Sequence, residues 1–264
     1  MADILQADAL QPDDRDFVTA LASGLEVIMA FDDSHPRMTL SEVAARTGMN
    51  RAKARRFLLT LHALGYVRKQ QRYFELSPKV LQLGYSFLSA NNYRSVIQQY
   101  LEDITAQCGE SSSLGILDGD EVIYVARSAA PHRLMSISLS VGTRLPAAHT
   151  SMGRVLLAQL SEPALDAYLS RIVLERHTEK TITDKEYLKK CINKVRQQGY
   201  AISDQELDPG LRSLAVPAFD MNGKLLGAIN ISTNAARVDM ETLLKHHLPL
   251  LQEKGRLIRS TISA

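Results

Sequence analysis

A run of basic side chains is the first feature of this sequence that could do chemistry. No acidic residue occurs between Glu42 and Glu75, whereas eight lysines and arginines fall in that interval. The other 23 basic residues (31 minus 8) are outnumbered by the 29 acidic ones, so the rest of the chain carries a charge of −6. A short positive segment on an otherwise acidic protein is typical of a nucleic-acid-binding module; a solvated charged surface is the alternative.

A second set of residues could do nucleophilic chemistry. His149, Ser151 and Asp204 are the residue types of a hydrolase triad. However, the serine stands in Thr-Ser-Met-Gly rather than Gly-x-Ser-x-Gly, and a histidine two residues away is poorly placed to activate it. No cysteine or histidine pair has metal-ligand spacing, and no phosphate-binding glycine loop occurs. We therefore predict no enzymatic activity and no cofactor, with a small-molecule hydrolase as the rival interpretation.

Helical signals surround the basic segment. Thr39-Leu40-Ser41-Glu42 has the form of a capping box, and the short helix that it begins ends at Gly48. Asn50 can cap a second helix, whose predicted buried residues are Ala54, Phe57, Leu58, Leu61 and Leu64. An earlier helix is predicted from an apolar face of Phe17, Leu21, Leu25, Ile28 and Met29. Two short helices joined by a tight turn form a helix-turn-helix.

The second of these helices has the properties of a recognition helix. Arg51 and Lys53 lie in its first turn, where positive charge opposes the helix dipole, so a phosphate or guanine partner explains them better than stability does. Residues 66–76 read as two short strands with a basic tip, the wing of a winged helix. The predicted DNA-binding residues are Thr39, Ser41, Asn50, Arg51, Lys53, Arg55, Arg56, Thr60, Arg68, Lys69 and Arg72.

The chain then divides into further parts. We predict an N-terminal tail over 1–16, a DNA-binding domain over 17–77, a linker helix over 78–92 and a second domain over 93–264. The linker helix begins at Ser77-Pro78 and is apolar on more than one side. It packs either within its own chain or against the same helix of a second subunit, which would place two winged helices side by side on a palindromic site.

The second domain alternates hairpins and helices. Strands are predicted at 113–117, 122–127, 134–141, 200–203, 213–219 and 225–232. Helices are predicted at 93–108, 151–160, 163–171, 185–197 and 240–260. This pattern indicates an α+β fold, with an antiparallel sheet flanked by helices rather than a doubly wound one. The chain has no long apolar stretch, an acidic N-terminus and two distant cysteines, so we expect a soluble, cytoplasmic protein without disulfides or membrane contact.

Three segments of the second domain resemble the IclR family of bacterial transcription regulators. They are LPAAHTSMGRVLLAQLSE (145–162), GYAISDQELDPGLRSLAVPAFD (199–220) and GKLLGAINIST (223–233), and the resemblance extends over residues 17–262. It implies a GAF-like effector domain that binds a small organic molecule, and dimers or dimers of dimers on operator DNA. Asn91–Arg94 and the HTSMGR loop are similar to the subgroup governing protocatechuate, 4-hydroxybenzoate and β-ketoadipate breakdown. RNA polymerase is a further candidate partner of such a regulator, and a DNA-binding protein without an effector is the other alternative.

The effector site is predicted from the residue types themselves and from the resemblance to the IclR family. A carboxylate would suit the helix start that follows His149, although Ser151 could equally be only the helix cap. Arg144 and Arg212 could pair with an acid or lie solvated at the surface, and Asp204 could bind a ligand hydroxyl or order its loop. The predicted effector-binding residues are Arg144, Leu145, His149, Thr150, Ser151, Met152, Gly153, Asp204, Glu206, Arg212, Leu214, Asn230 and Ser232.

Overall fold

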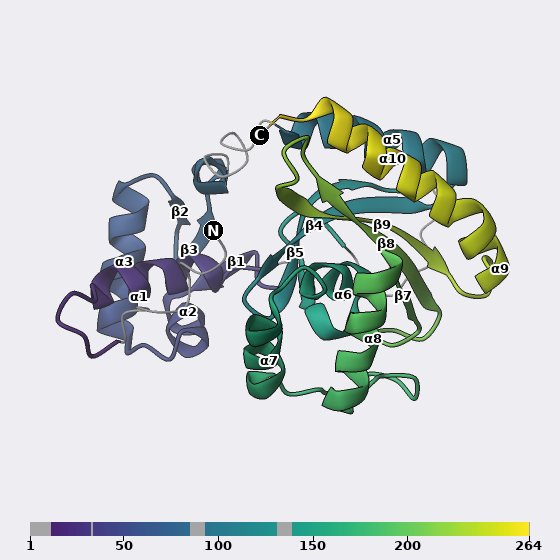
Figure 1. Ribbon diagram of the computed structural model, residues 1–264. Coiled ribbons are helices and arrows are strands. Elements are labelled where there is room, and N and C mark those ends of the chain that lie inside the picture. Colours follow the sequence, from purple (N-terminus) through teal and green to yellow (C-terminus); the bar gives the residue numbers. More distant parts are fainter. Residues whose placement is uncertain (1–11, 33, 85–92, 131–138, 264) are drawn as a thin grey trace. The chain divides into compact units, whose positions relative to one another are not determined.

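The computed structural model describes residues 12–32, 34–84, 93–130 and 139–263. The chain divides into two compact units, Met1–Ser89 and Ala90–Ala264, each drawn in Figure 1. In the described part of the chain, no helix is long and apolar enough to cross a bilayer. Two predicted features, the linker helix beyond residue 84 and most of the strand over 134–141, lie outside the described residues.

The first unit is a winged helix-turn-helix, as predicted. Its elements in chain order are α1 (Thr19–Met29), β1 (Arg37–Thr39), α2 (Leu40–Arg46), α3 (Arg51–Ala63), β2 (Val67–Gln70), β3 (Tyr73–Leu76) and the 3₁₀ turn η2 (Pro78–Val80). The capping box is confirmed, because the Thr39 amide donates to the Glu42 carboxylate at 2.6 Å and the Glu42 amide donates back to Thr39 Oγ1. Asn50 Oδ1 accepts from the Lys53 amide at 2.8 Å. Local side-chain bonds therefore set the two helix starts.

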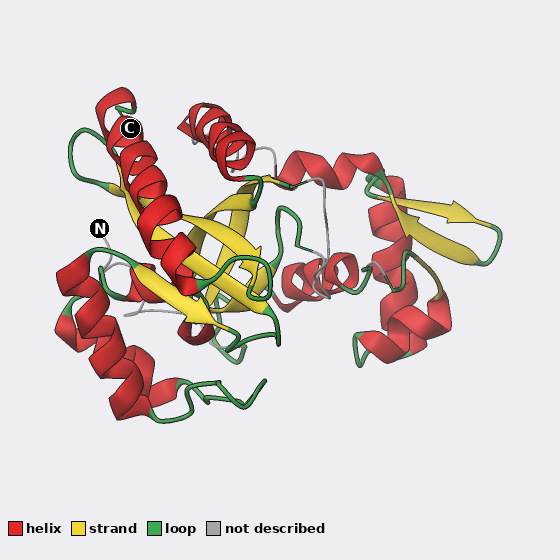
Figure 2. Ribbon diagram, turned by 90° about the vertical axis from the view of Figure 1, so that its right-hand side faces the viewer, coloured by secondary structure: helices red, strands yellow, loops and turns green. Residues whose placement is uncertain are grey.

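The wing belongs to a sheet that has one more strand than predicted. β3 lies between β2 and β1, and both pairs are antiparallel. Figure 2 shows β2 and β3 as the pair of yellow arrows extending beyond the helices of their unit. The three-residue strand β1 was not predicted because it is too short to show an alternation.

The buried face of α1 differs from the apolar face by which the helix was predicted, although Ile28 of that face packs against the core. Ser23 and Val27 are the buried residues of this helix, and Val27 packs with Met38, Leu58 and other core residues of the unit. By contrast, Leu21 is 64% exposed and Met29 is 71% exposed. Likewise Leu64, predicted inside α3, is 53% exposed because it lies at the helix C-cap. The apolar stripe of α1 is left uncovered by its own unit.

The second unit is built on a six-stranded antiparallel sheet, which confirms the predicted α+β class. The strand order is β6-β5-β4-β9-β8-β7. The strands are β4 (Ser111–Asp118), β5 (Glu121–Ser128), β6 (Arg144–Pro146), β7 (Ala201–Asp204), β8 (Leu211–Phe219) and β9 (Leu225–Asn234). The sequence did not predict β6, another three-residue strand, which exists through its pairing with Glu121–Ile123 of β5.

Helices cover both faces of this sheet (Figure 1). On one face α5 (Tyr93–Cys108) and α10 (Leu248–Thr261) enclose a core with Leu214, Ile229 and Ile231. On the other face lie α6 (Ser151–Leu157), α7 (Glu162–Arg171) and α8 (Lys185–Gln198). The predicted helix over 240–260 is interrupted, since α9 (Met240–Thr242) leads into a π-helical turn at Leu243–His247 before α10 begins.

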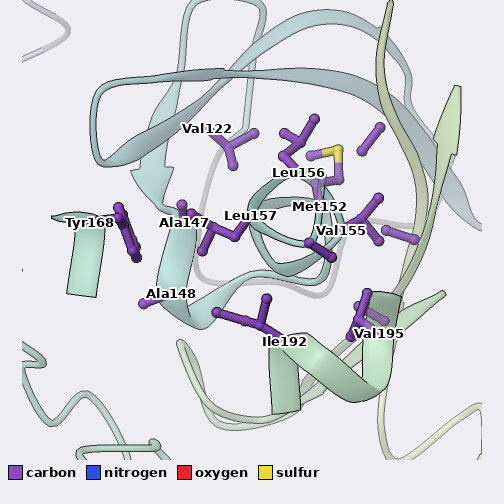
Figure 3. Close-up of a cluster of buried hydrophobic side chains, with 14 of the residues drawn as sticks. Val122, Ala147, Ala148, Met152, Val155, Leu156, Leu157, Tyr168, Ile192 and Val195 are labelled. Atoms are coloured by element: carbon purple, nitrogen blue, oxygen red, sulfur yellow. The ribbon is translucent and has the colours of Figure 1, made fainter. Parts of the chain in front are cut away.

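Helix α6 is the centre of the second layer. All seven of its residues are buried, and its side chains Met152, Val155, Leu156 and Leu157 pack in the cluster of Figure 3. Gly153 makes this close approach possible, because a Cβ there would lie 2.1 Å from the carbonyl oxygen of Ala147. The preceding segment at residues 147–150 is therefore packed tightly against α6.

Candidate DNA-binding and effector sites

The predicted recognition helix presents a basic surface. Ala54, Leu58 and Leu61 of α3 face the core of the first unit. Because they occupy the buried side of the helix, Arg51, Arg55 and Arg56 point outward to solvent. Thr60 is also exposed, with its hydroxyl bonded to the Arg56 carbonyl oxygen at 2.8 Å. Thr39 is occupied as a helix cap, while Ser41 and Asn50 lie exposed at the starts of the two helices.

Among the described residues, the basic side chains of α3 and the wing have no ion-pair partners. Six arginines of the second unit are paired with a carboxylate: Arg144, Arg154, Arg171, Arg196, Arg212 and Arg237. Exposed arginines without such a pair also occur in its described part, at Arg176, Arg256 and Arg259, so what marks α3 and the wing is the clustering of their unpaired cations. None of Arg51, Lys53, Arg55, Arg56, Arg68 and Lys69 forms such a pair. Arg72 donates to the hydroxyl of Tyr73 at 3.0 Å. Exposed cations that the protein leaves unneutralised are suited to bind phosphate groups and base edges.

The second unit contains a cavity between α6 and the sheet. Several predicted residues line it: Leu145, His149, Thr150, Ser151, Met152, Asn230 and Ser232. The sequence did not indicate the other lining residues, which are Tyr124, Leu139, Ser203, Leu207, Leu211 and Ser213. As the described residues enclose it, the cavity has room for about one water molecule.

A row of small polar side chains forms the floor of this cavity. Ser111, Ser232, Ser213 and Ser203 are directly opposite one another on β4, β9, β8 and β7, so they share one face of the sheet. Three of these serines line the cavity, and Asn230, two residues from Ser232, donates to its hydroxyl at 3.0 Å. A hydrophobic residue at any of these positions would fill the space below α6. Alternation along β8 would have separated Ser213 from Leu214, whereas the row itself depends on the register of four strands.

Several predicted effector residues lie outside the cavity. Leu214 faces the opposite core, because it alternates with Ser213 along β8. Gly153 packs against Ala147 and lines no cavity. Arg144 is an exposed residue of β6, paired with Glu121 at 2.6 Å and Asp118 at 2.8 Å. These three residues, which were predicted to bind the effector, are therefore not part of the lining of this cavity.

The charged residues around the cavity are already paired. The Arg154 guanidinium is 4% exposed and forms a two-pronged ion pair with Glu206. Arg212 donates to Asp204 at 2.8 Å across the β7–β8 hairpin, and Lys180 contacts the same carboxylate. Burial alone would raise the pKa of Asp204. Hydrogen bonds from Arg212 and Lys180 outweigh that effect, so the pKa of this carboxyl is lowered. Asp204, Glu206 and Arg212 thus organise the cavity walls rather than line the cavity.

The start of α6 differs from the prediction in one detail. Thr150, not Ser151, is the N-cap, and its Oγ1 accepts from the Gly153 amide at 3.0 Å. Ser151 is the first helical residue, and its hydroxyl donates to Ser213 at 2.8 Å. The cap prediction for Ser151 is therefore wrong, and the bond to Ser213 instead ties α6 to the serine row of the sheet.

His149 is the most unusual titratable group of the cavity. Its side chain is buried, and Nδ1 has no hydrogen-bond partner. Its ring meets the edge of His177 at a centroid distance of 5.2 Å. Burial, then the proximity of His177 and Arg154, lowers the pKa of His149 to about 4. The imidazole is therefore neutral at physiological pH.

The triad chemistry of a hydrolase is not assembled. Ser151 donates to Ser213, Asp204 pairs with Arg212 and Lys180, and no hydrogen bond joins either residue to His149 within the described structure. A hydrolase base must reach both the nucleophile and an orienting carboxylate. The described residues also contain no cluster of three or more potential metal ligands.

Together, these sites define a class of protein: a basic winged helix-turn-helix joined to a separate domain with a polar cavity. Residues 20–71 match the family described as "IclR helix-turn-helix domain", and residues 85–260 match "Bacterial transcriptional regulator IclR C-terminal". The chain belongs to the IclR family of bacterial transcriptional regulators. Membership confirms the prediction of a regulator rather than an enzyme.

Individual relatives agree with this assignment. The chain is 45% identical to the Pca regulon regulatory protein of Pseudomonas putida, over 92% of this chain and 84% of that protein. It resembles the crystal structure of a transcriptional regulator from Rhodococcus sp. RHA1, with 48% identity, a TM-score of 0.81, and 92% and 97% of the two chains covered. The second domain is similar to the inducer-binding domain of a double mutant of PobR from Acinetobacter in complex with 3-hydroxybenzoic acid. That match has 32% identity, a TM-score of 0.60, and covers 64% of this chain and 98% of the other.

Proposed function

We propose that this protein binds operator DNA through α3 and the wing. An aromatic acid that enters the second domain then weakens or strengthens this DNA binding. The observation that carries the DNA-binding part is the set of exposed basic residues without ion-pair partners on α3 and β2. Arg51 and Lys53 lie at the end of the helix that would approach base edges, and Arg68 and Lys69 would contact the backbone. Binding to promoter DNA implies that the protein acts in the cytoplasm.

The recognition helix is tested by substitution. Arg51→Ala or Arg55→Ala should weaken operator binding by about 1–3 kcal/mol, roughly 5- to 150-fold, because a bidentate contact is lost. Fluorescence anisotropy with a labelled promoter fragment measures the effect. The control is Arg259→Ala, which removes an exposed arginine from α10 of the other unit and should leave affinity unchanged. If both recognition-helix variants bind like the wild type, α3 does not read DNA.

The effector that we propose is a hydroxylated benzoic acid or a related acid of the protocatechuate and β-ketoadipate pathways. Support comes from the cavity lined by polar and apolar side chains, from the Pca regulon relative and from the hydroxybenzoate complex of the PobR domain. Because the cavity has room for about one water, an acid must separate α6 and its loop from the sheet. This rearrangement supplies the differential affinity through which a ligand can change DNA binding.

We further propose that two copies associate through α1. Val18, Leu21, Leu25 and Met29 recur at helical spacing and are 63%, 64%, 45% and 71% exposed. A second copy with the same stripe would cover them, and two recognition helices are what a palindromic operator requires. Contact with RNA polymerase and assembly into tetramers would follow only on the operator-bound dimer.

The α1 stripe gives a direct test of self-association. Leu21→Glu with Leu25→Glu should convert a dimer to a monomer in sedimentation velocity and reduce operator affinity at least tenfold, because one half-site then binds alone. Both residues are exposed in the single chain, so its fold should persist. Glu26→Gln, an exposed residue on another side of α1, is the control. A double variant that remains dimeric would place the interface elsewhere.

A further inference from the structure

The cavity presents a problem of charge if its ligand is an acid. A carboxylate that leaves water for a buried site needs hydrogen-bond donors and a compensating positive charge. Yet the cavity lining of the described residues contains no lysine or arginine. Its polar members are hydroxyls, one amide and the His149 imidazole, all of them neutral at pH 7.

Among the described residues, three arginines on the elements around the cavity are bonded to other groups. Arg154 uses Nε on the Ala148 carbonyl oxygen at 2.9 Å and both terminal nitrogens on Glu206. Arg212 donates to Asp204 and to the Val238 carbonyl oxygen. Arg127 of β5 donates to Ser113 at 3.2 Å and is not among the lining residues. Recruiting Arg154 would leave Glu206 without its ion-pair partner, and recruiting Arg212 would leave Asp204 with Lys180 alone.

His149 is the group that can change its charge. It lies at the cavity, its side chain is 2% exposed, and its buried Nδ1 has no hydrogen-bond partner. The titratable groups that face it are His177 at its ring edge, Arg154 of α6 with Glu206, and Tyr124 of β5 across the cavity. Burial raises the pKa of Tyr124 to about 12, so this phenol stays neutral. The nearby positive charge of Arg154 disfavours a second cation at His149, and an anion in the cavity would offset this effect by its attraction to the imidazolium.

We propose that His149 takes up one proton from solvent when an anionic effector binds, and that its Nδ1–H then donates to the effector carboxylate. This inference rests on the proposed effector class. The added proton balances the charge of the incoming acid, so the cavity remains neutral overall. The surrounding ion pairs stay intact. It follows that effector affinity falls as pH rises, because the complex holds one more proton than the free protein and anion do together.

The test is calorimetry of 4-hydroxybenzoate, 3-hydroxybenzoate and protocatechuate binding to the full chain at pH 7, in phosphate and in Tris. These buffers release different heats when they give up a proton, so the difference reports the protons taken up. We expect about one proton per site, and an association constant that falls about tenfold per pH unit between pH 6 and pH 8. His149→Gln should bind at least tenfold more weakly, with no proton uptake and no pH slope. His246→Gln, an exposed histidine, should match the wild type.

Two results would overturn the inference, and they differ in what else they affect. Binding without proton uptake would reject the role of His149 and leave the proposed effector class standing. If Arg127→Met then abolished binding, that arginine would be the counter-charge. Absence of binding by all three acids would reject both the role of His149 and the proposed effector class.

Discussion

Glu206→Ala should destabilise the second unit by about 3–5 kcal/mol. The Arg154 side chain is 4% exposed. Without Glu206, the hydrogen bond left to its guanidinium within the described structure is the one from Nε to the Ala148 carbonyl oxygen. An isolated buried charge is far more costly than the intact pair is favourable. The same substitution should remove the effector response, because the pair ties α6 to the segment after β7.

Calorimetric unfolding of the full chain measures this loss in the transition of the second unit. The double variant Arg154→Met with Glu206→Leu should recover much of the stability, since it removes both charges together. Glu241→Ala breaks an exposed pair with Lys245, in which both side chains are more than two-thirds exposed, and should have little effect. A single Glu206→Ala variant as stable as the Glu241→Ala control would show that the buried pair does not hold α6 in place.

Gly153→Ala should also be strongly destabilising, by roughly 2–3 kcal/mol or more. Its Cβ would lie 2.1 Å from the Ala147 carbonyl oxygen and 2.4 Å from Ala147 Cα, which are backbone atoms that cannot rotate away. Helix α6 would have to move from the loop at 147–150, and the cavity would change shape. Thermal unfolding and 4-hydroxybenzoate calorimetry on the same sample check both consequences.

Gly255→Ala is the matched control for this change. Gly255 also lies in a helix, α10, but its Cβ would be 3.6 Å from the nearest atom, a Val216 methyl group, which is ordinary contact. The substitution should therefore stabilise by about 0.5–1 kcal/mol through helix propensity. The two changes are chemically identical and should have opposite signs. Equal effects would mean that the close approach of α6 and Ala147 carries no energetic weight.

The parts of the fold that the sequence predicts correctly depend on neighbours within a few residues. The caps at Thr39 and Asn50 are bonds to residues three positions away, and both helices begin as expected. The hairpins of β4 with β5 and β8 with β9 are likewise joined by short turns. Each of these caps and turns is determined by residues close together in the sequence, so one sequence is enough to predict them.

The predictions fail where the burial or pairing of a residue depends on residues far away in the sequence. Most of the apolar stripe of α1 is exposed, which the sequence could not reveal, because periodicity shows that a face is apolar but not what covers it. Arg154 and Glu206 are 52 residues apart, so neither the pair nor the exclusion of Glu206 from the cavity lining could be predicted. Alternation along β8 separates Ser213 from Leu214, but the register of four strands decides that the serines meet in one row, and the sequence does not give that register.

The central claim is that an aromatic acid changes the affinity of this protein for a specific DNA sequence. The most direct measurement is the dissociation constant for the promoter region next to its own gene, in 150 mM salt, with and without 4-hydroxybenzoate or protocatechuate. The account predicts binding at least about 1,000-fold tighter than to unrelated DNA, and a change of at least about fivefold when an acid is added. Equal affinity for promoter and unrelated DNA, or a promoter affinity that no acid alters, would contradict it.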